Sequence, residues 1–170
     1  MKVIHLLRHA KSSWEDPSQR DAERPLAPRG RRAARAMARH LGHEGIGPAL
    51  ILCSPAQRTR ETLALIADAL PDVPVQVEEE LYGADEEQLL ARLRSLPPTV
   101  PSVLVVGHNP GLHELAVALA GRGEPGALAR LRTKMPTGAL ATLQAPGSHW
   151  RDLLPGGAEL VAFVVPRELA

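Results

Sequence analysis

Aromatic residues and cysteine are scarce in this sequence of 170 residues, and each scarcity excludes a class of protein. The four aromatic side chains, Trp14, Tyr82, Trp150 and Phe163, are too few for binding single-stranded nucleic acid by base stacking. Cys53 has no second cysteine with which to form an internal disulfide bond, and no group of cysteines and histidines has the spacing of a zinc site. We therefore expect a protein of a reducing compartment, the cytoplasm, without a structural metal.

Long apolar segments are also missing from the sequence. No run approaches the roughly 20 apolar residues that a membrane-spanning helix needs, and the N-terminus lacks the length and the cleavage site of a signal peptide. With 44% hydrophobic and 23% charged residues, the composition is that of one globular domain over residues 1–170 with a sizeable core. We expect no association with a membrane.

Charge is distributed unevenly along the chain, although the net charge is only +1. Residues 1–60 contain 12 Lys and Arg against five Asp and Glu, whereas residues 61–170 contain eight against 14. This asymmetry indicates an anionic ligand near the N-terminal half. The arginines between residues 29 and 39 are interpreted as the solvated face of a helix and not as a nucleic-acid site, because no aromatic residues are interleaved with them.

Hydrophobic periodicity predicts strands that alternate with helices. Short apolar runs predict strands over residues 3–7, 49–53, 103–106, 139–144 and 158–165, with a weaker candidate over 73–77. Helical spacing is found over residues 29–41, between Pro55 and Pro71 with Leu63, Ile66, Ala67 and Leu70 facing inward, over 86–96, and after Pro110. This alternation predicts a three-layer α/β/α sandwich with a mostly parallel sheet.

Polar motifs follow the three strongest predicted strands. Arg8-His9 comes after the first strand, Ser54 to Arg58 after the second, and Gly107-His108-Asn109 after the third. Ligands of parallel sheets bind at the carboxyl ends of the strands, so two arginines and two histidines should converge there. Guanidinium groups match phosphate oxygens, and a neutral imidazole nitrogen can act as a nucleophile. The pattern therefore predicts phosphoryl transfer.

These motifs resemble those of the histidine phosphatase superfamily, whose fold is phosphoglycerate mutase-like. The segment from Leu7 to Ser12 is similar to the Arg-His-Gly signature of that family, with Ala10 in place of the glycine. Residues 54–62 are similar to its Ser-x-x-x-Arg-x-x-x-Thr segment, and residues 106–109 to its late Gly-His motif. The short length and the Arg24-Pro25-Leu26 segment resemble the bacterial phosphohistidine phosphatases of the SixA type.

The resemblance implies a role for each matching residue. His9 takes the phosphoryl group as a covalent phosphohistidine, without a metal or another cofactor, and water then hydrolyses this intermediate. Arg8, Arg58 and His108 bind the phosphate, and Arg24 matches a further arginine near the same site. From its position alone, Asn109 is equally consistent with a helix cap and with a contact to the ligand.

The general acid is left open. Glu80 lies roughly where other members of the superfamily carry an acidic residue, although Glu78 and Glu79 precede it directly, and Asp16 in the loop after Trp14 is the alternative. If the substrate is phosphohistidine, the leaving imidazole has a conjugate acid with a pKa of about 6.5 and needs little protonation. A missing acid would therefore favour phosphoramidates over alkyl phosphates.

We expect a phosphatase that acts on phosphohistidine in a protein, with residues 11–28 forming a loop over the site. One alternative is a phosphatase of small phosphorylated metabolites. Another is a non-catalytic module that binds phosphorylated partners through the same arginines. A cysteine phosphatase is disfavoured, because the spacing from Cys53 to Arg58 or Arg60 does not fit its phosphate loop.

Overall fold

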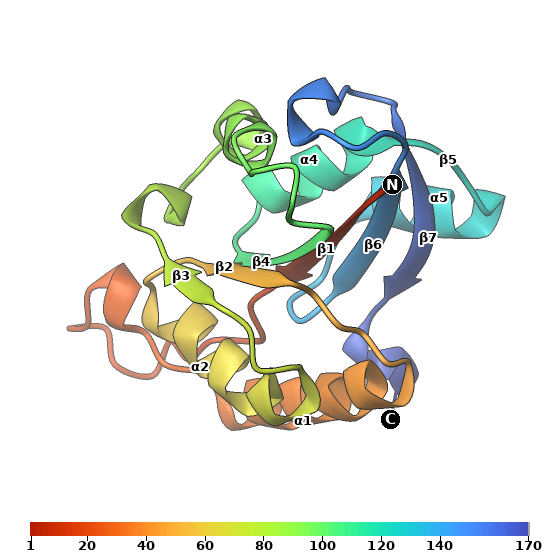
Figure 1. Cartoon of the computed structure of the whole chain (residues 1–170). Coiled ribbons are helices and arrows are strands. Elements are labelled where there is room, and N and C mark those ends of the chain that lie inside the picture. Colours follow the sequence, from red (N-terminus) through yellow and green to blue (C-terminus); the bar gives the residue numbers. More distant parts are fainter. Residues whose placement is uncertain (170) are drawn as a thin grey trace.

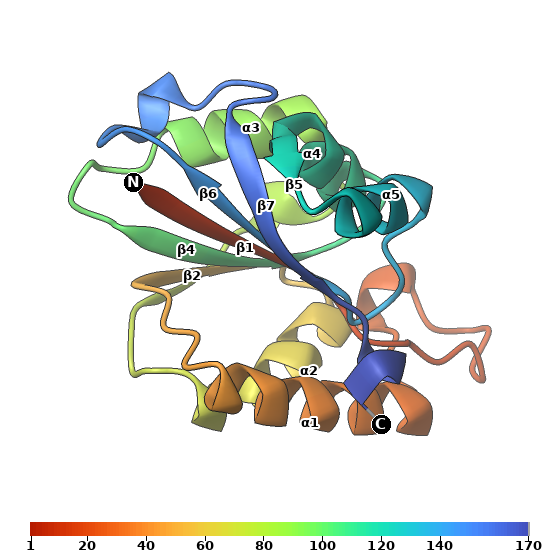
Figure 2. The same cartoon turned by 90° about the vertical axis from the view of Figure 1, so that its right-hand side faces the viewer.

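The structure, a computed structural model that describes residues 1–169, is a seven-stranded sheet between two layers of helices (Figures 1 and 2). The strands are β1 (Lys2–Arg8), β2 (Leu50–Cys53), β3 (Val75–Val77), β4 (Ser102–Gly107), β5 (Ala120–Gly123), β6 (Leu140–Ala145) and β7 (Ala158–Val164). The α-helices are α1 (Pro28–His43), α2 (Gln57–Ile66), α3 (Glu86–Arg94), α4 (Gly111–Leu119) and α5 (Pro125–Thr133). This architecture confirms the predicted α/β/α fold class.

The strands are ordered β3-β2-β4-β1-β6-β7-β5 across the sheet. Strands β3, β2, β4 and β1 run parallel to one another, β6 is antiparallel to both of its neighbours, and β5 is parallel to β7. The sheet is therefore mostly parallel. The three strands that precede the polar motifs, β2, β4 and β1, are adjacent, so their carboxyl ends share one edge of the sheet.

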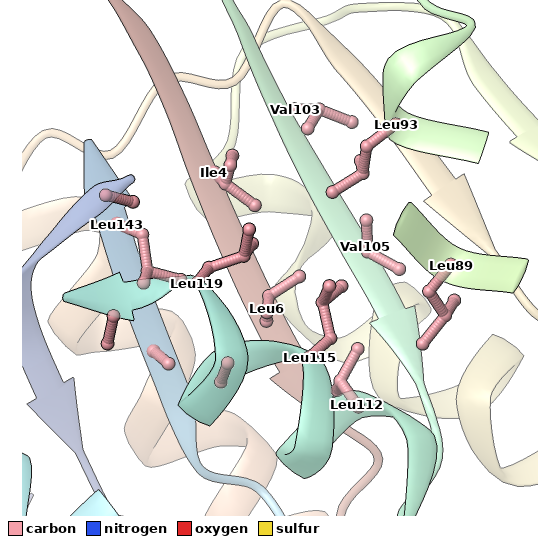
Figure 3. Close-up of a cluster of buried hydrophobic side chains, with 14 of the residues drawn as sticks. Ile4, Leu6, Leu89, Leu93, Val103, Val105, Leu112, Leu115, Leu119 and Leu143 are labelled. Carbon is pink, nitrogen blue, oxygen red and sulfur yellow. The ribbon is translucent and has the colours of Figure 1, made fainter. Parts of the chain in front are cut away.

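Helices α1 and α2 cover one face of the sheet, and α3, α4 and α5 cover the other (Figure 2). The larger hydrophobic cluster lies between β1, β4 and helices α3 and α4, where Ile4, Leu6 and Val105 pack against Leu112 and Leu115 (Figure 3). Burial of each such side chain contributes about 1.5–3 kcal/mol. Aliphatic side chains thus do most of the packing in this aromatic-poor chain.

Helix α1 turns its small and apolar residues toward the sheet and the loop before it. Ala34, Met37 and Leu41 are buried, and the arginines between them point away, as the periodicity predicts. Gly30 is buried on the same face, against the backbone of Lys11. A Cβ atom at residue 30 would overlap the carbonyl oxygen of Lys11, so this approach of helix to loop requires glycine.

Substitution of Gly30 by alanine is expected to lower the free energy of unfolding by about 1–3 kcal/mol, because the new methyl group must push the Lys11 backbone away. Gly42, in the same helix, is the matched control, since a Cβ there meets nothing closer than 3.8 Å. Gly42→Ala should be neutral or stabilising by up to about 1 kcal/mol. Urea unfolding measures both variants, and equal stabilities would contradict the packing argument.

Two parts of the chain differ from the sequence prediction. Strand β5 and helix α5 were not predicted, because the Ala120–Gly123 strand is short and glycine-rich and joins the sheet only at the edge beside β7. Helix α2 ends at Ile66 instead of continuing toward Pro71, and Ala67, predicted to face inward, is exposed. The buried face of α2 contains polar side chains because this face supports the site. No helix among residues 1–169 is long and apolar enough to cross a membrane.

Candidate active site

A cavity of about 350 Å³ lies at the carboxyl ends of β1, β2 and β4. The strand register pairs Arg8 with Gly107 and Cys53 with Val106, so the residues that follow the three strands are level with one another. The cavity is lined by Arg8, His9, Lys11, Ser12, Trp14, Asp21, Arg24, Arg58, His108, Asn109 and Thr137. The structure therefore brings together the two arginines and two histidines that the sequence predicted to converge.

His9 is held rigidly by backbone bonds on both sides. Its amide donates to the carbonyl of Gly107 at 3.1 Å, and the amide of Gly138 donates to the carbonyl of His9 at 2.9 Å. The ring nitrogen Nδ1 lies 2.7 Å from the carbonyl oxygen of Ala10. Because a carbonyl oxygen only accepts, Nδ1 carries the proton and Nε2 keeps its lone pair. This tautomer is the one that a nucleophilic histidine needs.

Burial keeps both site histidines uncharged near pH 7. It lowers the pKa of His9 to about 3, while the bond to Ala10 raises it; the charges of Arg58 and Arg8, and that of His108 when its ring is protonated, lower it further. Burial lowers the pKa of His108 to about 4, again with a contribution from Arg58. The centroids of the two rings are 5.4 Å apart. Two neutral imidazoles thus lie beside two guanidinium groups.

Three buried polar atoms without a hydrogen-bond partner belong to residues that line this cavity. In residues 1–169 they are Nε of Arg8, Nδ1 of His108 and Oδ1 of Asn109, and all three residues line it. Each of these atoms is shielded from the open cavity by its neighbours, so the missing partners are a free-energy cost that the fold carries at this wall.

Asn109 belongs to the cavity wall and does not cap α4. Its side-chain amide donates to the carbonyl of Met135 at 2.9 Å, and Arg8 Nη1 donates to the same carbonyl at 3.0 Å. Helix α4 begins at Gly111, with no side-chain cap at Pro110. Of the two interpretations that the sequence left open, the helix cap is not formed, and a contact from Asn109 to a ligand stays a prediction.

Helix α2 supplies Arg58 and holds the backbone that follows His9. Thr62 lies one turn after Arg58, and its hydroxyl donates to the Arg58 carbonyl at 2.7 Å and accepts the Ala10 amide at 3.0 Å. Ser54, before the helix, lies 2.7 Å from Nε2 of His108 through its hydroxyl. The Ser-x-x-x-Arg-x-x-x-Thr segment therefore connects the carboxyl ends of β1, β2 and β4: Thr62 binds the backbone after β1, and Ser54, which follows β2, contacts His108 after β4.

Asp21 is a cavity residue that sequence reasoning missed. Its Oδ1 accepts from Arg24 Nη1 at 2.9 Å, and its Oδ2 accepts from Arg58 Nη2 at 3.0 Å and from the Tyr82 hydroxyl at 2.5 Å. The bonds from Tyr82, Arg58 and Arg24 hold the pKa of the Asp21 carboxyl well below its usual range. The only available signal was that Asp21 lies three residues before Arg24 in the Arg24-Pro25-Leu26 motif.

The two predicted candidates for the general acid lie outside the cavity. Asp16 is exposed and accepts from the amide and hydroxyl of Ser18, at 3.0 and 2.6 Å, because its turn closes on itself. Glu80 is exposed on the Glu79–Leu81 turn and lines a separate hollow with Glu78 and Arg92. The turn leaves Glu80 outside and brings the next polar residue, Tyr82, to Asp21.

The predicted loop over residues 11–28 forms one wall of the cavity. Arg24 is its central side chain: Nε donates to the carbonyl of Ser13 at 3.1 Å, and Nη2 donates to the hydroxyl of Ser12. The Arg24 guanidinium also stacks 3.2 Å from the ring centroid of Trp14, which is 73% exposed. Arg24 therefore shapes this wall as well as facing the cavity.

Cys53 contributes no nucleophile to this site. It is the last residue of β2, is completely buried, and is absent from the residues that line the cavity. Burial raises the pKa of its thiol to about 12, so the thiolate is not available near pH 7. The structure agrees with its interpretation as a buried strand end.

The neutral buried histidines are expected to make the fold sensitive to acid. Burial also lowers the pKa of His5, to about 4, alongside the values of His9 and His108. Below pH 6.5 these histidines bind protons in the unfolded chain but not in the folded chain, so the free energy of unfolding falls as the pH falls. Each histidine contributes a slope that approaches about 1.4 kcal/mol per pH unit between pH 6 and pH 4.

Urea unfolding at pH 7 and pH 5 measures this effect. In His5→Gln the free energy of unfolding should fall less steeply with decreasing pH, because one of the three buried histidines is removed while His9 and His108 remain. Equal free energies of unfolding at the two pH values would contradict the neutral state of these histidines.

Comparison with known proteins identifies the family. The sequence profile of the histidine phosphatase superfamily (branch 1) matches residues 4–89. An uncharacterized protein of Mycobacterium tuberculosis is 40% identical over 163 residues, which cover 95% of this chain and 100% of that protein. The chain belongs to the histidine phosphatase superfamily.

The fold of this member of the superfamily is similar to that of solved structures from the SixA group. A structure from Nakamurella multipartitia, provisionally assigned as the phosphohistidine phosphatase SixA, has a TM-score of 0.81 and 35% identity, covering 97% of this chain and 96% of that one. The protein histidine phosphatase SixA complexed with tungstate has a TM-score of 0.75 and 27% identity, covering 99% of each chain. The resemblance seen in the sequence is thereby confirmed.

Proposed function

We propose that this histidine phosphatase hydrolyses phosphohistidine in a protein, with His9 as the nucleophile. The observation that carries the proposal is the Nδ1 bond from His9 to Ala10, which leaves Nε2 with a lone pair in a cavity beside Arg8, Arg58 and His108. An oxyanion, tungstate, was bound to one of the similar SixA proteins. A phosphoryl group is the oxyanion that this set of donors fits.

In the proposed first step, Nε2 of His9 attacks phosphorus as the bond from phosphorus to the substrate imidazole breaks, and this imidazole leaves uncharged because its other ring nitrogen carries a proton. The guanidinium groups of Arg8 and Arg58 and the ring of His108 bind the three equatorial oxygens, on which the charge is spread. The proton on Nδ1 stays on the bond to Ala10 and balances the charge of the new phosphoimidazole. His9 then carries the phosphoryl group.

In the second step, water attacks the phosphorus of phospho-His9. A bond from water oxygen to phosphorus forms, the bond from phosphorus to Nε2 breaks, and the proton of the water leaves with inorganic phosphate or solvent. His9 returns to the neutral tautomer that began the cycle. Its low pKa makes it a good leaving group here, because the departing imidazole needs no added proton.

The acid-base groups of the cavity favour a phosphoramidate over an alkyl phosphate. Among residues 1–169 the only carboxyl group that lines the cavity is that of Asp21, and it is paired with Arg24 and Arg58. A carboxylate held in this way is a poor proton donor. The imidazole of a phosphohistidine leaves with little protonation, whereas an alkoxide requires it.

The proposal extends to cofactors, partners and location. Imidazole and guanidinium groups supply the nucleophile and the positive charge, so we propose catalysis without a metal or other cofactor, by a single domain of residues 1–170. The substrate is a phosphorylated protein. In the alternative function, that of a small-molecule phosphatase, it is a small phosphorylated metabolite. Neither nucleic acid nor a membrane takes part. The single buried Cys53 favours the reducing cytoplasm.

The experiment that tests the proposal compares two substrates side by side. Phosphate release is measured from a phosphohistidine-bearing phosphotransfer protein and from p-nitrophenyl phosphate, each with and without a metal chelator. Faster release from the protein, unaffected by the chelator, is expected. Release from the ester alone would indicate a small-molecule phosphatase, and phosphate binding without release from either would indicate a binding module.

A further inference from the structure

We propose that Asp21 is a positioning residue, the carboxylate that fixes the orientation of Arg58 and Arg24 around the phosphoryl group. This inference rests on the proposed function and deepens it. Asp21 lies on a short turn, Asp21–Glu23, inside the long loop that precedes α1. The residues that it contacts come from its own turn, from α2 and from the turn before α3, so it joins three segments that are distant in the sequence.

Asp21 accepts two hydrogen bonds from Arg58. Arg58 Nη1 donates to the backbone carbonyl of Asp21 at 2.8 Å, and Nη2 donates to its side chain at 3.0 Å. These bonds occupy two of the five N–H groups that a guanidinium carries and leave the others for a ligand. A guanidinium group that is bonded at both terminal nitrogens cannot rotate freely on its long side chain. Its remaining N–H groups therefore keep one direction.

Charge balance gives a second reason for a carboxylate at this position. The side chains of Arg58 and Arg24 are only 9% and 8% exposed, and Asp21 is their shared anionic partner. Burial lowers the pKa of Arg8, and the charge of nearby Arg58 lowers it further. Without Asp21, three guanidinium groups would face one cavity with no counter-charge, and their repulsion would spread them apart.

The bonding pattern assigns positioning to Asp21 and not proton transfer. Oδ1 accepts from Arg24, and Oδ2 accepts from both Arg58 and Tyr82; these three bonds stabilise the charged carboxylate, which has no proton to donate near pH 7. Tyr82 also stands edge-on to the ring of His108, with centroids 5.5 Å apart at 85°. The Asp21–Tyr82 pair therefore supports the His108 side of the cavity as well.

The first test compares Asp21→Asn with wild type on p-nitrophenyl phosphate and phenyl phosphate, whose leaving groups differ in pKa. We expect kcat/KM to fall by about tenfold or more, by the same factor for both esters, because the effect acts through the arginines. Glu23→Gln is the matched control: it lies on the same turn, pairs only with exposed Arg20, and should keep full activity. A loss that grows with leaving-group pKa would make Asp21 a proton donor and overturn the proposal.

A second test does not depend on turnover. Binding of inorganic phosphate is measured by calorimetry for Asp21→Asn, Arg58→Lys and the double variant. The Asp21 substitution should change the phosphate affinity by about threefold or more in wild type and by much less beside Arg58→Lys, because lysine cannot form the fork. Additive effects, or no effect of Asp21→Asn, would overturn the proposal.

Two controls separate the possible failures. If wild type hydrolyses no substrate, the proposed function is wrong, while the phosphate measurements still decide the role of Asp21. If Asp21→Asn does not fold, Tyr82→Phe removes only one of the bonds to the carboxylate and should show a smaller loss that is again equal for both esters. A Tyr82→Phe loss confined to the ester with the poorer leaving group would count against positioning.

Discussion

His9→Ala is expected to remove the phosphoenzyme completely and to lower kcat by about 10⁴-fold or more, as the loss of a nucleophile does in other covalent catalysts. The reason is that the bond from Nδ1 to Ala10 leaves Nε2 of His9 as the lone-pair nitrogen of the proposed nucleophile. His108 is the nearest alternative, but its Nε2 lies 2.7 Å from the Ser54 hydroxyl. The measurements are phosphate release and the label left on the enzyme after a quench without acid.

The label itself is diagnostic, because a phosphohistidine is labile in acid and stable in base. His43→Ala is the control, since His43 is exposed at the end of α1 and far from the carboxyl ends of the strands. It should show the wild-type label and turnover. An acid-labile label of wild-type intensity on His9→Ala would show that another residue is the nucleophile.

Arg58→Ala is expected to lower kcat/KM by about 10²–10³-fold, the usual cost of losing one donor to a developing negative charge. Two effects combine in this variant. The phosphoryl oxygens lose the N–H groups of a buried guanidinium, and the Asp21 carboxylate loses the fork that balances its charge. The measurement is kcat/KM with p-nitrophenyl phosphate, together with the affinity for inorganic phosphate.

Arg58→Lys distinguishes charge from geometry. It retains the positive charge but not the planar fork, so it should recover only part of the activity. Arg60→Ala is the matched control, because Arg60 is exposed on the same helix, two residues further on. Nearly wild-type activity in Arg58→Ala would remove Arg58 from the phosphate site and leave Arg8 as the principal donor.

The effects of pH on activity and on stability have different origins in this molecule. Above about pH 5 both His9 and His108 are neutral in the folded chain, so they should not limit the rate near pH 6.5. The unfolded chain, in contrast, titrates its histidines near pH 6.5. An acid limit on stability is therefore expected at a higher pH than the acid limit set by the nucleophile.

The sequence by itself was sufficient for the fold class and for the residues that line the centre of the cavity. Apolar runs alternate with amphipathic segments, and this pattern specifies a parallel sheet covered by helices. Arg8 is the last residue of a strand, His9 and His108 each follow directly after a strand, and Arg58 lies in the first turn of the helix after another. Because local rules place such residues at one edge of the sheet, their convergence could be predicted without coordinates.

Only the tertiary structure decided which acidic residue joins the cavity. Asp16, Asp21 and Glu80 all lie in non-periodic segments, where no hydrophobic pattern tells which way a side chain points. The path of the loop is set by contacts distant in the sequence. The Lys11 backbone packs against Gly30, Ser12 and Leu26 form an isolated antiparallel β-bridge, and the Arg58 guanidinium donates to the Asp21 carbonyl. The same limit applies to β5 and α5, since an edge strand of small residues is stabilised by its neighbour β7 and not by its own pattern. Local periodicity determines which elements form, and long-range packing determines what the loops between them bring together.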